Sequence, residues 1–252
     1  VEITELHSAA WTITGYLLGY VCAIPIMGNL SDIYGRRNIY GCAMVIFMVG
    51  SAASALSNSV EWLLFSRIIQ SIGAGALVPV SIALIGDLYQ PDKRGLPLGM
   101  AGGVAEAGAM IGPLLGGIIT QFLDWRWIFW MNIPMGMFIL IALYIYTPSS
   151  IRRDVKVDYI GFCLITGILC SITLACTKVA TPGLGMVIYC SLAATLTIAY
   201  IGFASRISYS PIIPNILFRS VNFCAANFAH FIYGGSLIIA MVTIPLMANT
   251  IL

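Results

Sequence analysis

Charged residues are scarce in this chain of 252 residues, since Asp, Glu, Lys and Arg together make up 9% of it. Soluble domains carry about 25%. Apolar residues make up 60% of the chain, and the mean hydropathy is +0.95. A surface with so little charge is poorly solvated by water. The composition therefore excludes an ordinary soluble domain and predicts a protein surrounded by lipid.

Histidines and metal-binding cysteine patterns are scarce as well. His7 and His230 are the two histidines, and the seven cysteines show no CxxC spacing. The chain contains neither an HExxH nor a Gly-x-Ser-x-Gly motif. These absences argue against a metal site and against a membrane-embedded hydrolase. We therefore predict no cofactor, no nucleic-acid partner and no enzymatic activity, and we interpret the cysteines as small packing residues.

About eight apolar runs are each long enough to cross a membrane, because about 20 helical residues span a core of ~30 Å. They cover residues 9–28, 39–56, 62–88, 96–122, 127–147, 159–177, 184–204 and 222–249. The predicted fold class is all-α, a polytopic transmembrane helical bundle. We expect the protein to be a monomer in the lipid bilayer.

The basic residues predict the orientation of this bundle. Loops at 29–38, 89–95, 148–158 and 205–221 carry nine Lys or Arg residues, whereas the opposite loops carry Arg126 and Lys178. The positive-inside rule therefore puts the four basic loops in the cytoplasm. The segment at Val1 then starts outside and lacks the basic leader of a signal peptide. We expect the sequence to be part of a longer protein with at least one span before Val1.

One cluster of charge lies between the first two apolar runs, in residues 28–37. Its pattern is Gly28-x-x-x-Asp32-x-x-Gly35-Arg36-Arg37. We interpret it as a short turn between two helices, in which the glycines permit tight turning and close helix approach. The positive-inside rule explains the two arginines but not the aspartate.

This pattern closely resembles the loop between the second and third helices of the major facilitator superfamily of transporters. The resemblance implies that Asp32 and Arg36 form a charge network with an acid at the cytoplasmic end of the fourth family helix. Asp87 occupies that place here. It further implies that the network latches the cytoplasmic side shut in the outward-open state and breaks when the transporter switches.

A second motif, Arg67-x-x-Gln70-Ser71-x-Gly73-x-Gly75, resembles the fourth-helix motif of that superfamily, in which the arginine is linked to proton movement. The chain departs from the pattern at Ser71, where glycine is preferred. Arg67 lies about five residues, or ~8 Å, from the outer end of its span. Such an arginine is costly unless it faces a cavity or a partner, which predicts proton or substrate coupling. The alternative is a side chain that snorkels to the outer surface.

A third motif reads Gly108-x-x-x-Gly112-Pro113-x-x-Gly116-Gly117. Glycines four residues apart line one face of a helix and make a groove for a neighbouring helix, and the proline can kink the helix. The motif resembles the antiporter motif, which is characteristic of exporters in the superfamily. The resemblance implies that this segment acts as a pivot.

Glu106 lies on the same span, about ten residues or ~15 Å from its cytoplasmic end and so near the midplane. It is two positions from Gly108, and we expect it to point away from the glycine groove, toward the central cavity or an arginine. A carboxylate there suits proton binding or cation recognition. The alternative is a protonated structural glutamate that hydrogen-bonds between helices.

Residues 124–134, DWRWIFWMNIP, form an aromatic belt at the outer boundary. The run closely resembles the start of the sixth helix in the drug:proton antiporters with fourteen helices, and Asp158-Tyr159-x-Gly161 resembles the start of their seventh. The resemblance implies most of the N-terminal six-helix bundle in residues 1–148, a linker with two inserted helices in 149–205, and the start of the C-terminal bundle in 206–252.

The function that these motifs imply is proton-coupled export of small amphipathic or cationic compounds by alternating access in the plasma membrane. Its partners are a small-molecule substrate, protons and lipid. An importer or uniporter for sugars or organic acids in the same superfamily is the alternative, and the motif at 108–117 argues against it.

Overall fold

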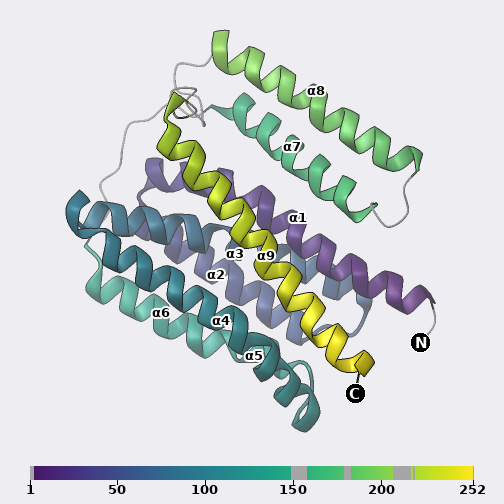
Figure 1. Ribbon diagram of the computed structural model, residues 1–252. Helices are drawn as coiled ribbons and strands as arrows, with labels where there is room; N and C mark the ends of the chain where they lie inside the picture. The colour runs from purple at the N-terminus through teal and green to yellow at the C-terminus, as the bar shows by residue number, and fades with distance from the viewer. Residues whose placement is uncertain (1–2, 149–157, 179–182, 207–216, 218, 252) are drawn as a thin grey trace.

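The computed structural model describes residues 3–148, 158–178, 183–206, 217 and 219–251, with side chains from residue 11 onward except for 204–206 and 237–251. The regular elements are α1 (Ile3–Tyr34), α2 (Arg36–Ala55), α3 (Val60–Leu88), the short 3-10 helix η1 (Pro91–Lys93), α4 (Gly95–Phe122), α5 (Trp127–Trp130), α6 (Asn132–Tyr146), α7 (Tyr159–Thr177), α8 (Leu184–Arg206) and α9 (Val221–Ile251). No strand occurs in this part of the chain. The all-α prediction is confirmed (Figure 1).

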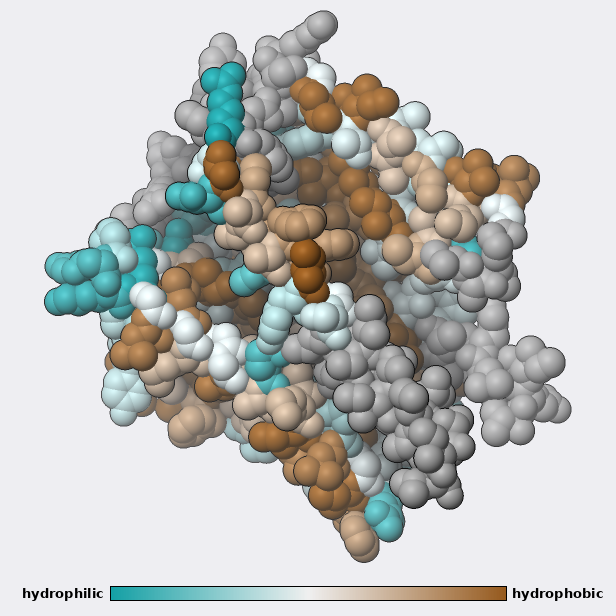
Figure 2. All heavy atoms as spheres, in the orientation of Figure 1, coloured by the Kyte–Doolittle hydropathy of each residue, from teal (hydrophilic) through white to brown (hydrophobic). Residues whose placement is uncertain are grey.

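Seven segments of the described chain are long and apolar enough to cross a membrane. They correspond to the first seven spans that the sequence predicts, and α9 covers the eighth. The large apolar side chains of α4, including Leu96, Val104 and Met110, are exposed, as lipid-facing or partner-facing residues are. Figure 2 shows apolar residues across much of one face, with hydrophilic residues gathered mostly near its edge.

Helices α1, α2 and α3 pack into the tightest part of the bundle because small residues face one another there. A Cβ atom at Gly50 of α2 would overlap the backbone of Gln70 on α3. A Cβ at Gly73 would overlap the backbone of α2, and one at Gly75 would overlap the backbone of α1. Such positions let membrane helices approach closely. Ser71 is fully buried in this contact, so the departure from glycine is accommodated.

Helices α7 and α8 pack against each other, and α7 also packs against α1 (Figure 1). Asp158 caps the start of α7, where its carboxylate accepts a hydrogen bond of 2.8 Å from the Gly161 backbone N–H. The sulfurs of Cys22 on α1 and Cys170 on α7 lie 3.0 Å apart. The residues that the sequence assigns to inserted helices therefore contact α1.

The turn predicted at 28–37 is wrong in extent. Helix α1 continues to Tyr34, α2 begins at Arg36, and Gly35 alone joins them with φ 93° and ψ 131°. Hydropathy marks where the lipid core ends, whereas a helix can continue beyond it as long as its backbone is hydrogen-bonded. The glycine at this joint is explained by its positive φ. Gly28 is not a close-approach site, since no described atom lies near a Cβ placed there.

The predicted span at 127–147 is also interrupted. The short helix α5 ends at Trp130, and α6 begins at Asn132. Pro134 lies in the first turn of α6, where its missing N–H costs nothing, but its ring disfavours a continuous helix through residue 130. The break brings the carbonyl of Phe129 to α2, where a buried serine binds it.

Candidate functional site

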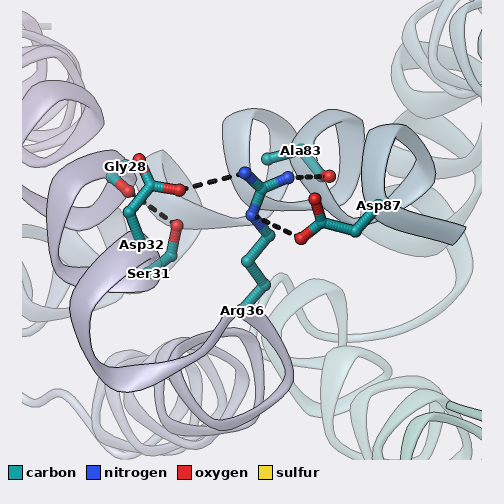
Figure 3. A network of polar contacts seen from close by, with 6 residues as sticks. All are labelled: Gly28, Ser31, Asp32, Arg36, Ala83 and Asp87. Carbon is teal, nitrogen blue, oxygen red and sulfur yellow. Dashed lines mark hydrogen bonds and ion pairs between the residues drawn. The ribbon is translucent and has the colours of Figure 1, made fainter. Parts of the chain in front are cut away.

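Arg36 is the centre of a charge network at the junction of α1, α2 and α3 (Figure 3). Its Nη2 lies 3.0 Å from Oδ1 of Asp32 on α1, and its Nε lies 3.0 Å from Oδ2 of Asp87 on α3. Its Nη1 donates to the carbonyl of Ala83. The structure thus brings Asp32, Arg36 and Asp87 together, as the resemblance of the motif predicts. Their action as a latch remains a prediction.

The local sequence positions this guanidinium. The buried hydroxyl of Ser31 donates 2.6 Å to the carbonyl of Gly28, and α1 continues past Asp32 to Tyr34. The abrupt change of direction at Gly35 then returns Arg36 toward that carboxylate. The arginine side chain is 14% exposed, while the carboxylates of Asp32 and Asp87 are 41% and 45% exposed. A mostly buried cation is therefore neutralised by acids that still contact solvent, which limits the desolvation cost.

Arg37 points to a different neighbour. Its Nη2 donates 2.8 Å to the carbonyl of Tyr144 on α6, and its guanidinium carbon lies 4.7 Å from the centre of that ring. Tyr144 also lies directly against Gly41 of α2. The two consecutive arginines thus hold the start of α2 to different helices, one to α1 and α3 and the other to α6.

Arg67 is the second candidate site. Its guanidinium carbon lies 4.0 Å from the ring centre of Tyr16 on α1 and 5.6 Å from that of Phe129 on α5. Its Nη1 donates 2.6 Å to Oε1 of Gln70. The side chain bonds to the turn that follows it in α3, which favours a fixed arginine over the snorkelling alternative. No carboxylate of the described residues pairs with it.

A buried polar network continues from Gln70. Its Nε2 donates 3.0 Å to the hydroxyl of Ser51 on α2, which also accepts 2.9 Å from Nδ2 of Asn132 on α6. Ser51 itself donates 3.0 Å to the carbonyl of Phe129. Ser51 belongs to none of the motifs recognised in the sequence. The only signal in the sequence was a hydroxyl within an apolar run, where a membrane interior demands a partner for it.

Glu106 and the glycines of α4 are not joined to these networks. Glu106 is partly exposed and makes no hydrogen bond or ion pair with any residue that the structure describes, so the expected arginine partner is absent there. No described atom outside the helix lies within 4 Å of a Cβ placed on Gly108, Gly112, Gly116 or Gly117. Pro113 lies within the continuous helix α4. The groove is therefore open along its length.

The junction before α5 is held by a third arginine. Arg126 lies 3.3 Å from the carboxylate of Asp124 and donates 2.9 Å to the carbonyl of Ser57. Its guanidinium also lies 4.7 Å from the ring of Trp125. Among the described residues no cluster of three metal-ligating side chains occurs.

Relatives of this chain match it over nearly its whole length. Multidrug resistance protein 3 of Bacillus subtilis is 33% identical over 254 residues, which cover 99% of this chain and 50% of that protein. A triacylglyceride transporter of Mycolicibacterium smegmatis is 32% identical over 267 residues, covering 100% of this chain and 46% of that protein. An uncharacterized MFS-type transporter of Mycobacterium tuberculosis is 29% identical over 249 residues. The chain spans about half the length of the first two relatives.

A family model adds to these matches. The model described as Major Facilitator Superfamily matches residues 3–251. The helical bundle formed by the described residues, the seven apolar segments of membrane length found among them and this match agree. The chain is therefore part of an integral, multi-pass membrane protein and belongs to the Major Facilitator Superfamily.

Proposed function

We propose that the full-length protein exports small amphipathic or cationic compounds across the plasma membrane in exchange for protons. Alternating access, in which two helical bundles rock about a central site, is the mechanism we propose for it. We also propose that it belongs with the drug:proton antiporters that have fourteen helices, and that the ranges 1–148, 149–205 and 206–252 are its bundle, inserted and second-bundle segments. The name of the Bacillus subtilis relative supports export of drugs.

The observation that carries export is the glycine and proline pattern on α4. Gly108, Gly112 and Gly116 follow one another at intervals of four residues, and no described atom covers their face. A helix with such a face lets a neighbour slide or pivot against it. Pro113 directly follows Gly112 inside α4 and weakens the helix locally. We propose that this segment is the pivot of the transport cycle.

The network at Arg36 supports the proposed latch. It ties the last turn of α1 and the last turn of α3 to the start of α2. With the four basic loops in the cytoplasm, as we propose, all three ends lie at the cytoplasmic surface. Loss of the Asp32 pair removes the ion pair between α1 and α2, whereas loss of the Asp87 pair leaves Arg36 bonded to α3 through the Ala83 carbonyl. Discrete changes of this kind are what a switch requires.

Proton coupling is assigned to Glu106, with Arg67 as a fixed cation. Glu106 is half-buried on an apolar helix and has no ionic partner among the described residues. The Arg67 guanidinium is held by Gln70 and Tyr16 and carries its charge at a set position. Together they provide one group that takes a proton and one that does not.

The test uses everted membrane vesicles that contain the full-length protein. A pH gradient is imposed, and the accumulation of ethidium is followed by fluorescence. We expect accumulation that stops when an ionophore collapses the gradient. Inserted protein without any accumulation would contradict export of cationic dyes, and uptake of a sugar or an organic acid would then favour the importer.

A second candidate substrate is a neutral lipid. The Mycolicibacterium smegmatis relative is named a triacylglyceride transporter. The large exposed apolar residues of α4 are compatible with a path along the lipid. The same vesicles, given a fluorescent acylglycerol in place of ethidium, distinguish the two substrates by which of the two probes accumulates.

A further inference from the structure

The hydroxyl of Ser51 is the meeting point of helices α2, α3, α5 and α6. It accepts hydrogen bonds from Nε2 of Gln70 at 3.0 Å and from Nδ2 of Asn132 at 2.9 Å, and it donates to the carbonyl of Phe129 at 3.0 Å. Ser51 is 0% exposed and Gln70 is 2% exposed. Water therefore does not replace any of these partners.

The number of hydrogens on this hydroxyl determines how Gln70 is oriented. A serine hydroxyl carries one hydrogen and two lone pairs. That hydrogen goes to the carbonyl of Phe129, so the oxygen acts only as an acceptor toward the two amides. Gln70 must then present its amide nitrogen to Ser51, which leaves its oxygen for Nη1 of Arg67 at 2.6 Å.

The reversed orientation of Gln70 is unfavourable on both sides. It would set the amide hydrogens against the guanidinium of Arg67 and the amide oxygen against the oxygen of Ser51. Buried polar groups left in this way carry a substantial penalty. The backbone of Gln70 is itself fixed, because Gly50 of α2 packs directly on it.

We propose that Ser51 is a positioning residue for the arginine site. It sets the orientation of the Gln70 amide, and that amide holds the Arg67 guanidinium against the ring of Tyr16. The consequence for transport rests on the proposed function, in which Arg67 is the fixed cation of proton coupling. The effect of Ser51 on the position of the Arg67 side chain does not depend on the proposed function, and it is measured separately.

The geometric test is arginine modification in the full-length transporter. Phenylglyoxal reacts with guanidinium groups, and the extent of reaction at Arg67 is read by peptide mass spectrometry against Arg36 as an internal reference. We expect Ser51→Ala to increase the rate at Arg67 roughly tenfold, since the Gln70 amide loses the partner of its nitrogen and with it the fixed orientation in which its oxygen makes a charge-assisted hydrogen bond to the guanidinium. Ser51→Thr keeps the hydroxyl and is expected to restore the original rate.

Ser54→Ala is the matched control. Ser54 lies on the same helix and is equally buried, but its hydroxyl bonds to the carbonyl of Gly50 at 2.8 Å and to Ser66 at 2.9 Å. Its loss leaves the contacts of Arg67 in place, so the rate at Arg67 is expected to stay unchanged. Equal reaction of Arg67 in the original protein and in Ser51→Ala, including none in either, would overturn the proposal.

A second pair of variants covers the case in which threonine is too large for the site. In Gln70→Glu both oxygens of the side chain are acceptors, so no orientation has to be set. Adding Ser51→Ala to Gln70→Glu is then expected to leave the rate at Arg67 unchanged. A tenfold increase in that background would show that Ser51 acts through general packing and would refute the assigned role.

The transport readout is the pH profile of ethidium export. We expect Ser51→Ala to shift the profile and Ser54→Ala to leave its shape unchanged. If arginine modification responds as expected while neither protein exports any tested dye, the proposed function fails and the positioning role stands. If export is proton-driven but modification is insensitive to Ser51, the positioning role fails and the proposed function stands.

Discussion

Replacing Arg36 by lysine tests whether the shape of the guanidinium, and not only its charge, holds the junction of α1, α2 and α3. Three nitrogens of Arg36 reach three different partners, the carboxylates of Asp32 and Asp87 and the carbonyl of Ala83. A lysine ammonium is a single point charge on a flexible stem and does not span such a set. Arg36→Lys therefore keeps the charge and loses the geometry.

The size of the effect follows from exposure. Both carboxylates are more than a third exposed, at 41% and 45%, so each ion pair contributes about 1 kcal/mol at most to the free energy of unfolding. A lysine retains about one of the two, so Arg36→Lys is expected to cost about 1 kcal/mol and Arg36→Ala about 2 kcal/mol. For chains of this size 1 kcal/mol corresponds to about 2–4 °C in Tm.

The assay is thermal unfolding of the purified protein in detergent, followed with a dye that fluoresces on reaction with newly exposed cysteines. Arg37→Lys is the matched control on the neighbouring residue, because the Tyr144 carbonyl accepts from a single nitrogen of Arg37 and a lysine ammonium can also donate to that acceptor. We expect Tm to fall by about 3 °C in Arg36→Lys and by about 6 °C in Arg36→Ala. A Tm of Arg36→Lys equal to that of the original protein, or a larger loss in Arg37→Lys, would refute the reasoning.

Three further changes test other parts of the chain. Oxidation with copper phenanthroline is expected to join Cys22 to Cys170, because their sulfurs are 3.0 Å apart and need to approach by only about 1 Å. If the variant with both cysteines replaced by serine crosslinks equally, the α1–α7 contact is contradicted. Glu106→Gln is expected to abolish proton-driven export while the protein stays inserted, and unchanged export would exclude its coupling role. Gly35→Ala is expected to lower stability by about 1 kcal/mol because φ is 93°, as measured by Tm; a neutral result would show that the joint relaxes.

The positions of the helices followed largely from composition. Apolar runs of membrane length have one viable backbone arrangement in lipid, the α-helix, because every N–H and C=O must be bonded within the segment. The exact ends of the helices were less well predicted from the sequence. The helix that reaches Tyr34 and the break at Met131 depend on local backbone hydrogen bonds and on Pro134, which a hydropathy profile does not register.

The charge network was predictable because its residues are unusual where they stand. Asp32 is an acid in a loop where the positive-inside rule predicts basic residues. The resemblance of its motif to the transporter family predicts Arg36 and Asp87 as its partners. The network at Ser51 was not predictable in the same way. Serine is common in membrane helices, and only the packing of α2 on α3 at Gly50 shows which hydroxyl meets Gln70.

The sequence by itself determined that this chain lies in a membrane, which segments cross it and which charged residues stand out, because hydropathy and charge are local properties. The tertiary structure alone decided the partners: Arg67 stacked on Tyr16 and bonded to Gln70, Glu106 with no ionic partner in the described chain, and Ser51 joining four helices. Those contacts depend on how closely and at which rotation the helices approach, and that is set by many small residues acting together.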